Sequence, residues 1–84
     1  MQGDRFEYDL ELGVLYLSAR RFEEARSALD RVSANKPDYP MALFKRAQVS
    51  VLLHEPDARE RIAAARTHAT AETARLIDSE RLFR

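Results

Sequence analysis

Cysteine is absent from this chain of 84 residues, and glycine occurs only twice. Without cysteine, the chain has neither a disulfide framework nor a thiolate metal site. Two glycines are too few for a glycine-rich loop that cradles phosphate. No apolar run approaches the length of a membrane span, and no signal peptide is visible. We therefore expect a cytoplasmic protein with no membrane partner.

The chain also lacks an excess of charge of either sign. Lysine and arginine together number 14, as do aspartate and glutamate, so the formal net charge is zero. A dedicated nucleic-acid binder normally shows a basic excess. Arg59, Arg61 and Arg66 lie on one predicted helix, but Asp57 and Glu60 interrupt them. We expect a solvated surface there and no nucleic-acid partner. The abundance of arginine and alanine is typical of a bacterial chain.

No set of residues in the sequence predicts catalysis. The two histidines, His54 and His68, lie near opposite ends of one predicted helix, too far apart to share a metal, and we expect surface or turn positions for both. The serines show no arrangement with a histidine and an acid that would activate a nucleophile. Glu23 and Glu24 stand at a helix N-terminus, where negative charge is favourable without catalysis. We expect no enzyme, no cofactor and no metal.

Apolar residues recur at helical spacing through the whole chain and predict an all-α fold of five helices. Asp4 and Glu7 form a potential capping box for the first helix. Asp38 is suited to cap the third helix, with a proline tolerated in the first turn. Pro56 is expected to open the fourth helix, and Thr70 to cap the fifth. The expected helices cover about 5–19, about 22–35, a segment that follows Asp38 and includes Leu52, 56 to 68 or 69, and 71 to 82 or beyond.

Gly13 lies within the first predicted helix, where glycine costs about 1 kcal/mol relative to alanine. Its presence indicates that another helix approaches too closely for a side chain. Ala25 on the second helix is the expected small residue opposite it. Leu12 and Tyr16 lie one turn apart on the same face and are expected to pack around this contact.

These positions form a pattern that resembles the tetratricopeptide repeat, a helix–turn–helix unit of about 34 residues. The first repeat covers about 6–39 and the second, less regular one about 40–72. Alignment of the two repeats requires a turn one residue shorter in the second. The first repeat carries the pattern in Leu12, Gly13, Tyr16, Ala25, Leu29, Val32 and Pro37, and the second has Arg46, Ala47, Ser50, Ala58, Ile62, Ala65 and Thr70 at the matching positions.

The resemblance implies an α-solenoid of two antiparallel helical hairpins and a fifth, capping helix at about 71–83, all in a single domain over 1–84. Two repeats fall short of the three that usually make a stable solenoid. We therefore expect a cap, self-association, or a chain that is part of a longer array, in which the fifth helix would begin a third repeat. In a cap, Leu76, Ile77 and Phe83 are expected to face the stack, and Arg75, Asp78, Arg81 and Arg84 to face water.

The family's partners usually lie along a concave surface formed by the first helix of each repeat. The resemblance thus implies a protein–protein interaction scaffold that binds a partner protein or peptide. The alternative is a structural homo-oligomerisation module with the same face buried in a homodimer. A third interpretation is that the face is covered by the fifth helix or is simply core. The residues expected on this face are Leu10, Val14, Leu17, Phe44, Gln48 and Val51.

Two further expectations concern the recognition of a charged partner. A subset of the family grips peptide carboxylates with lysine and asparagine, but the matching positions here are Leu10, Val14 and Gln48, so that clamp is absent. Lys45 and Arg46 are expected to be ordinary surface cations, with contact to an acidic partner as the alternative.

Overall fold

The computed structural model describes residues 5–84, and every regular element in this range is helical. This confirms the all-α prediction; Asp4, part of the expected capping box, lies outside the described residues. None of the described helices combines the length and the hydropathy needed to cross a membrane. The elements are α1 (Arg5–Ser18), α2 (Phe22–Asn35), α3 (Pro40–Leu52), α4 (Ala58–Thr67), α5 (Ala71–Ser79) and the 3₁₀ helix η1 (Arg81–Phe83).

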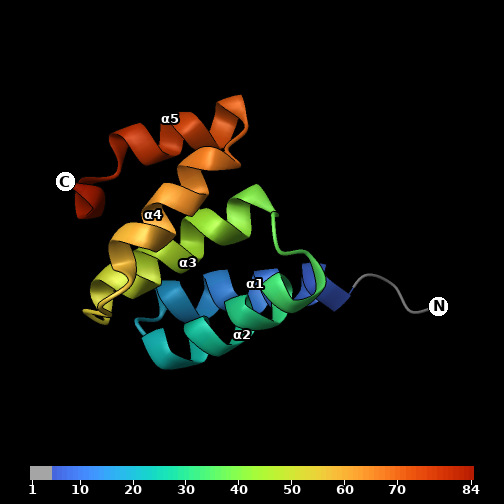
Figure 1. Ribbon diagram of the computed structural model, residues 1–84. Helices are drawn as coiled ribbons and strands as arrows, with labels where there is room; N and C mark the ends of the chain where they lie inside the picture. The colour runs from blue at the N-terminus through green and yellow to red at the C-terminus, as the bar shows by residue number, and fades with distance from the viewer. Residues whose placement is uncertain (1–4) are drawn as a thin grey trace.

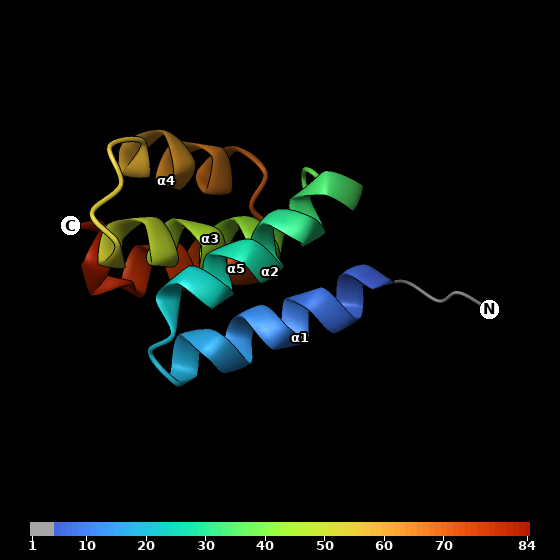
Figure 2. The same ribbon diagram turned by 90° about the horizontal axis from the view of Figure 1, so that it is seen from below.

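The helices are arranged as two antiparallel hairpins followed by a fifth helix (Figure 1). The α1–α2 hairpin packs through α2 against α3 of the α3–α4 hairpin. Seen from below, α1 and α4 therefore lie at opposite edges, with α2 and α3 between them (Figure 2). Helix α5 and η1 both pack on α3, and α5 also contacts α4.

The two hairpin turns share one backbone geometry. Arg20 and His54 each adopt a left-handed conformation, with φ of 63° and 58°. In each turn the next residue donates its backbone N–H to a carbonyl five positions earlier, Arg21 to Tyr16 at 2.8 Å and Glu55 to Ser50 at 2.9 Å. This is the Schellman pattern that ends many helices. Arg20 and His54 are 34 residues apart, so the same local structure recurs at that interval.

The first hairpin is close-packed at Gly13. A Cβ atom built on Gly13 would lie 2.6 Å from Cδ2 and 2.7 Å from Cγ of Leu29, which is fully buried. The close approach predicted for this glycine is confirmed, but the residue that it accommodates is Leu29. Ala25, expected opposite it, packs in the same core cluster one helical turn away.

Apolar side chains from α1, α2 and α3 join the two hairpins. Leu29 and Val49 form a buried cluster with Ala25, and Leu10 and Leu17 of α1 pack against it. A second cluster, of Phe6, Val32 and Ala42, is covered by Leu10 and Tyr39, and the Phe6 and Tyr39 rings meet edge to face at 5.1 Å.

Three predicted helix starts can be compared with the structure. Thr70 caps α5 as expected, in a reciprocal capping box with Thr73. Asp38 does not cap α3, because the helix begins one residue later and Tyr39 occupies the N-cap without a side-chain hydrogen bond. Helix α4 begins at Ala58, since Pro56 belongs to a turn.

The fifth helix ends earlier than predicted. The backbone of Glu80 is extended, and its carboxylate accepts a hydrogen bond from the Leu82 N–H that starts η1. This break turns Phe83 back onto α3, where it meets Phe44 edge to face at 5.9 Å. Ile77 is buried as expected, but Leu76, also expected to face the stack, is exposed.

Candidate interaction surfaces

The six residues expected on the concave face do not form one open surface. Leu10 and Leu17 are half-buried in the clusters that join the hairpins. Val14, one turn from each, is half-buried. Phe44 is only 4% exposed and packs with Ala65 and Ile77 in a third core cluster.

The remaining two predicted residues contact the segment after α4. The side-chain amide of Gln48 donates a hydrogen bond to the Glu80 carboxylate. Val51 lies beside Leu82 and Phe83 on the wall of a groove. In the second hairpin, the covering of the apolar face is therefore the chain's own α5–η1 segment, one of the interpretations that the sequence left open.

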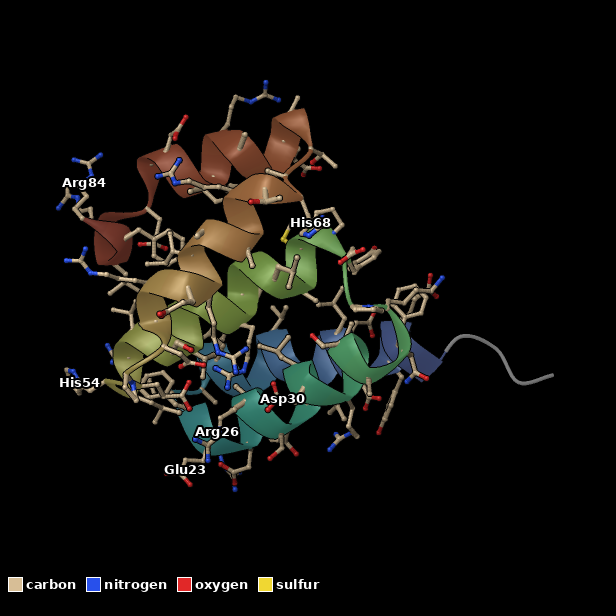
Figure 3. All side chains as sticks on the ribbon, in the orientation of Figure 1. Glu23, Arg26, Asp30, His54, His68 and Arg84 are labelled. Carbon is tan, nitrogen blue, oxygen red and sulfur yellow. The ribbon has the colours of Figure 1, made fainter. Side chains whose placement is uncertain are left out.

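Arg46 is almost fully buried, which corrects the expectation that it is a surface cation. Its side chain is 4% exposed, and the guanidinium donates from Nε to Asp30 at 2.8 Å and from Nη1 to Ser50 and Glu55, each at 2.8 Å. Glu55 also accepts from Arg26 at 2.8 Å. The network joins α2, α3 and the α3–α4 turn. Figure 3 shows two of its members, Arg26 and Asp30, on α2.

This network lowers the pKa of Glu55. Hydrogen bonding from Arg46 lowers the pKa of the Glu55 carboxyl from 4.5 to about 2, assisted by Ser50 and Arg26 and opposed by partial burial. The carboxylate is thus held ionised beside the buried Arg46 side chain. Its three donors all belong to the chain, so the network is structural.

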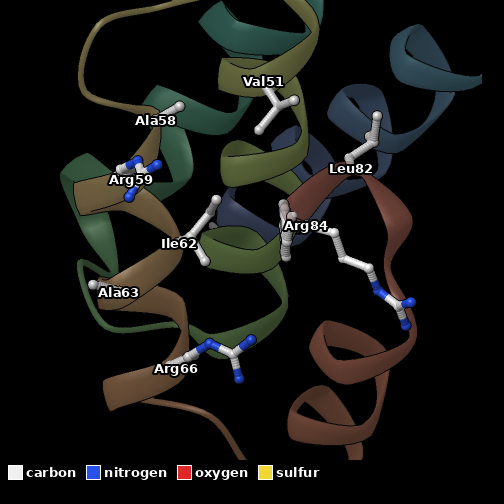
Figure 4. Close-up of a pocket in the computed structure, with 9 residues that line it drawn as sticks. Val51, Ala58, Arg59, Ile62, Ala63, Arg66, Leu82 and Arg84 are labelled. Atoms are coloured by element: carbon white, nitrogen blue, oxygen red, sulfur yellow. The ribbon is translucent and has the colours of Figure 1, made fainter.

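A groove with a volume of about 600 Å³ lies between α4, the end of α3 and η1 (Figure 4). Aliphatic and aromatic side chains from all three elements make its apolar surface. Arg59 and Arg66 of α4 and Arg84, the residue after η1, also line it. We call it the arginine groove; it is lined by Val51, Ala58, Arg59, Ile62, Ala63, Arg66, Leu82, Phe83 and Arg84.

The arginines of this groove are only lightly neutralised. Arg59 is exposed and has no ion-pair partner within residues 5–84. Arg66 meets Asp78 at 3.1 Å, and both side chains are exposed, so water screens the pair. Arg84 donates to the backbone carbonyl of Asp78 at 3.4 Å and makes no ion pair within the part of the chain that the structure describes. The groove therefore presents positive charge beside apolar surface.

A second exposed apolar surface lies on α1, facing away from α2. Tyr8 and Leu15 are 66% and 64% exposed, and Leu12 lies between them. Glu11 completes a shallow hollow of about 270 Å³, and Glu7 is exposed one residue before Tyr8. We call Tyr8, Leu12 and Leu15 the α1 stripe; its border is acidic.

Sequence reasoning overlooked both surfaces, although each carries a periodic signal. Positions 8, 11, 12 and 15 on α1, and 59, 62, 63 and 66 on α4, follow the i, i+3, i+4, i+7 spacing of one helical face. The sequence predicts Leu12 in the hairpin core, but its side chain lies at the edge of the hairpin and is only half-buried. The arginines on α4 resemble a solvated surface in the sequence because acidic residues are interleaved with them.

The polar residues of the described chain do not gather into a site for metal chemistry. No group of three or more histidine, cysteine, aspartate or glutamate side chains in residues 5–84 is placed to hold an ion. His54 lies in the second hairpin turn, and exposed His68 has Nε2 3.5 Å from Asp38. Both histidines occupy the turn or surface positions predicted for them.

Comparison of the whole chain with protein-family models, with curated proteins and with solved structures gave no match in any of the three.

Proposed function

We propose that this chain is an interaction module of the tetratricopeptide type, which binds a partner protein or peptide through the arginine groove. The single observation that carries the binding proposal is the groove itself. It combines about 600 Å³ of space, an apolar lining and arginines on its edge. Apolar pockets with a few directed polar groups are the usual form of binding sites.

The repeat-type architecture in this proposal rests on recurrence within the chain. The two left-handed turn residues, Arg20 and His54, are separated by the 34 residues of one such repeat. Gly13 and Ala47, the small residues of the sequence pattern, are both buried at this same separation. Helix α2 packs between α1 and α3, as expected for stacked hairpins.

The chemistry of the groove selects an acidic amphipathic segment as partner. Ile62 and Leu82 offer contact area to an apolar side chain, while Arg59 and Arg66 can pair with carboxylates. A helical segment with leucine and glutamate at i, i+3, i+4 and i+7 would present both kinds of group on one face. The concave face first expected to bind is filled at Phe44 by Ile77 and Phe83, so the proposed site is displaced from it and shares only Val51.

Fluorescence anisotropy with a labelled helical peptide tests this function. The peptide carries leucine and glutamate on one face, and its matched control carries lysine in place of glutamate. We expect the acidic peptide alone to bind, and Arg59→Glu to weaken its binding by about tenfold or more through charge repulsion in the groove. Arg75→Glu makes the same charge change on exposed α5, outside the groove, and should have little effect.

Two results would overturn the proposed function. One is the absence of binding by the acidic peptide at any concentration that keeps the chain soluble. The other is an equal loss of affinity in the Arg59→Glu and Arg75→Glu variants, because that would show only a response to net charge.

A further inference from the structure

The α1 stripe and the arginine groove match each other in spacing. On α1, Tyr8, Glu11, Leu12 and Leu15 stand at i, i+3, i+4 and i+7; on α4, Arg59, Ile62, Ala63 and Arg66 repeat that spacing. Seven residues of helix rise about 10 Å, so the two faces have the same length. Ala63 is small, which lets a second helix approach α4 closely.

The two surfaces are also complementary in charge. Glu7 and Glu11 border the α1 stripe, whereas Arg59 and Arg66 border the groove. In a helix-on-helix contact, the apolar residues would meet centrally and the opposite charges would meet at the edges. Such a pattern favours this pairing over the contact of two α1 stripes, which would bring glutamates together.

The two surfaces lie on opposite edges of the molecule. Figure 2 shows α1 at one edge and α4 at the other, with α2 and α3 between them. One chain therefore cannot bring its own α1 stripe to its own groove without unfolding the hairpins. A second copy can supply it, and each added copy leaves one stripe and one groove open.

We propose that copies of this chain associate head to tail, with the α1 stripe of one copy seated in the arginine groove of the next. The proposal rests on the proposed function in taking the groove as a docking site, and it names a second copy as the occupant. The contact is heterologous, so association does not close at a dimer but continues with concentration.

Light scattering and sedimentation across micromolar to millimolar concentrations test the proposal. The average mass of the wild-type chain should rise above the 9.7 kDa of one copy and should not level off at twice that value. Leu15→Glu places a negative charge in the α1 stripe, and Arg59→Glu reverses a charge of the arginine groove. Each variant alone should therefore stay monomeric. Arg75→Glu, outside both surfaces, should associate as the wild type does.

A mixture of the two monomeric variants is the decisive sample. The Arg59→Glu chain retains a stripe and the Leu15→Glu chain retains a groove, so one contact remains between them. We expect a 1:1 dimer that grows no further. Leu15 is exposed, so its substitution should leave the helical circular dichroism unchanged; Tyr8→Glu, equally exposed, replaces it if the first variant fails to fold.

Three results would overturn head-to-tail association: a wild type that is monomeric at millimolar concentration, an Arg59→Glu variant that associates normally, or a variant mixture that stays monomeric. The peptide assay separates this proposal from the proposed function. If the acidic peptide binds while the chain stays monomeric, the groove is a docking site and only its assignment to a second copy fails. If association follows the variants as expected but the peptide does not bind, the assignment stands and general peptide recognition fails.

Discussion

Arg46 and Glu55 form a nearly buried ion pair, with Nη1 of the arginine 2.8 Å from Oε1 of the glutamate. The arginine side chain is 4% exposed and the glutamate side chain 16%. Burial of charge is costly unless every charged group is paired and hydrogen-bonded. Here Asp30 and Ser50 complete the partners of Arg46, so the pair fixes the α3–α4 turn against α2.

Glu55→Gln should therefore destabilise the fold strongly. The substitution preserves size but leaves Arg46 buried without its main counter-charge, and we expect the free energy of unfolding to fall by about 2–4 kcal/mol. Urea denaturation monitored by circular dichroism measures this loss. Glu60→Gln is the matched control, because Glu60 is exposed on α4 and should change stability by about 0.5 kcal/mol or less. Equal urea midpoints for the Glu55→Gln and Glu60→Gln variants would contradict the structural role of the Arg46–Glu55 pair.

Stability should also depend on pH through Glu55. Its pKa in the folded chain is about 2, below the ordinary 4.5, so the unfolded chain takes up the proton more readily. The contribution of the Glu55 carboxylate to the free energy of unfolding is fully present above pH 4.5 and is lost as the pH falls from 4.5 towards 2. We expect a loss on the order of 2 kcal/mol from this group.

Urea titrations at neutral and acidic pH measure that dependence. The Glu55→Gln variant has no carboxyl to titrate at this position, so its stability should fall less between the two conditions than that of the wild type. An identical fall in both chains would show that other acidic residues account for the whole effect.

Local signals in the sequence were sufficient for part of this fold. The bounds of α2 match the prediction at Phe22 and Asn35, and Thr70 caps α5 as expected. These features depend on apolar periodicity and on residues close in the chain. The sequence does not predict the Glu80 break, because the contact of Phe83 with Phe44 that accompanies it joins positions far apart in sequence.

The candidate site was predicted less well, for the same reason. Arg46 was expected at the surface because its compensating partners, Asp30 and Glu55, are 16 and 9 residues away. The arginine groove depends on the return of η1 towards α4, which periodicity within a single helix does not encode. Phe44 was recognised as apolar, but the covering segment could not be chosen from the sequence alone.

Gly13→Ala should destabilise the first hairpin even though alanine favours helix. The new Cβ would lie 2.6 Å from a side-chain atom of Leu29, which is fully buried and would have to shift against its core neighbours. We expect a net loss of about 1–3 kcal/mol, measured by urea denaturation.

A double-mutant cycle checks the cause of that loss. In a Leu29→Ala background the clash is gone, and Gly13→Ala should become neutral or stabilising by up to about 1 kcal/mol, the difference in helix propensity. The same loss in both backgrounds would mean that Leu29 is not the residue that requires glycine.

Phe83→Ala should loosen the segment that covers α3. The substitution removes the edge-to-face contact with Phe44 and should cost about 1–2 kcal/mol, since Phe83 is only half-buried. Hydrogen exchange should accelerate in α5 more than in α1 or α2. Uniform acceleration through all helices would contradict a local role for this contact.

A titration of the isotope-labelled chain with the acidic amphipathic peptide, followed by nuclear magnetic resonance, tests the arginine groove as the binding site most directly. We expect chemical-shift changes to gather on the groove, at Arg59, Ile62 and Leu82, while residues of α2 stay unchanged. Changes confined to other surfaces, or no changes under conditions where the chain is folded, would contradict the assignment of the groove as the binding site.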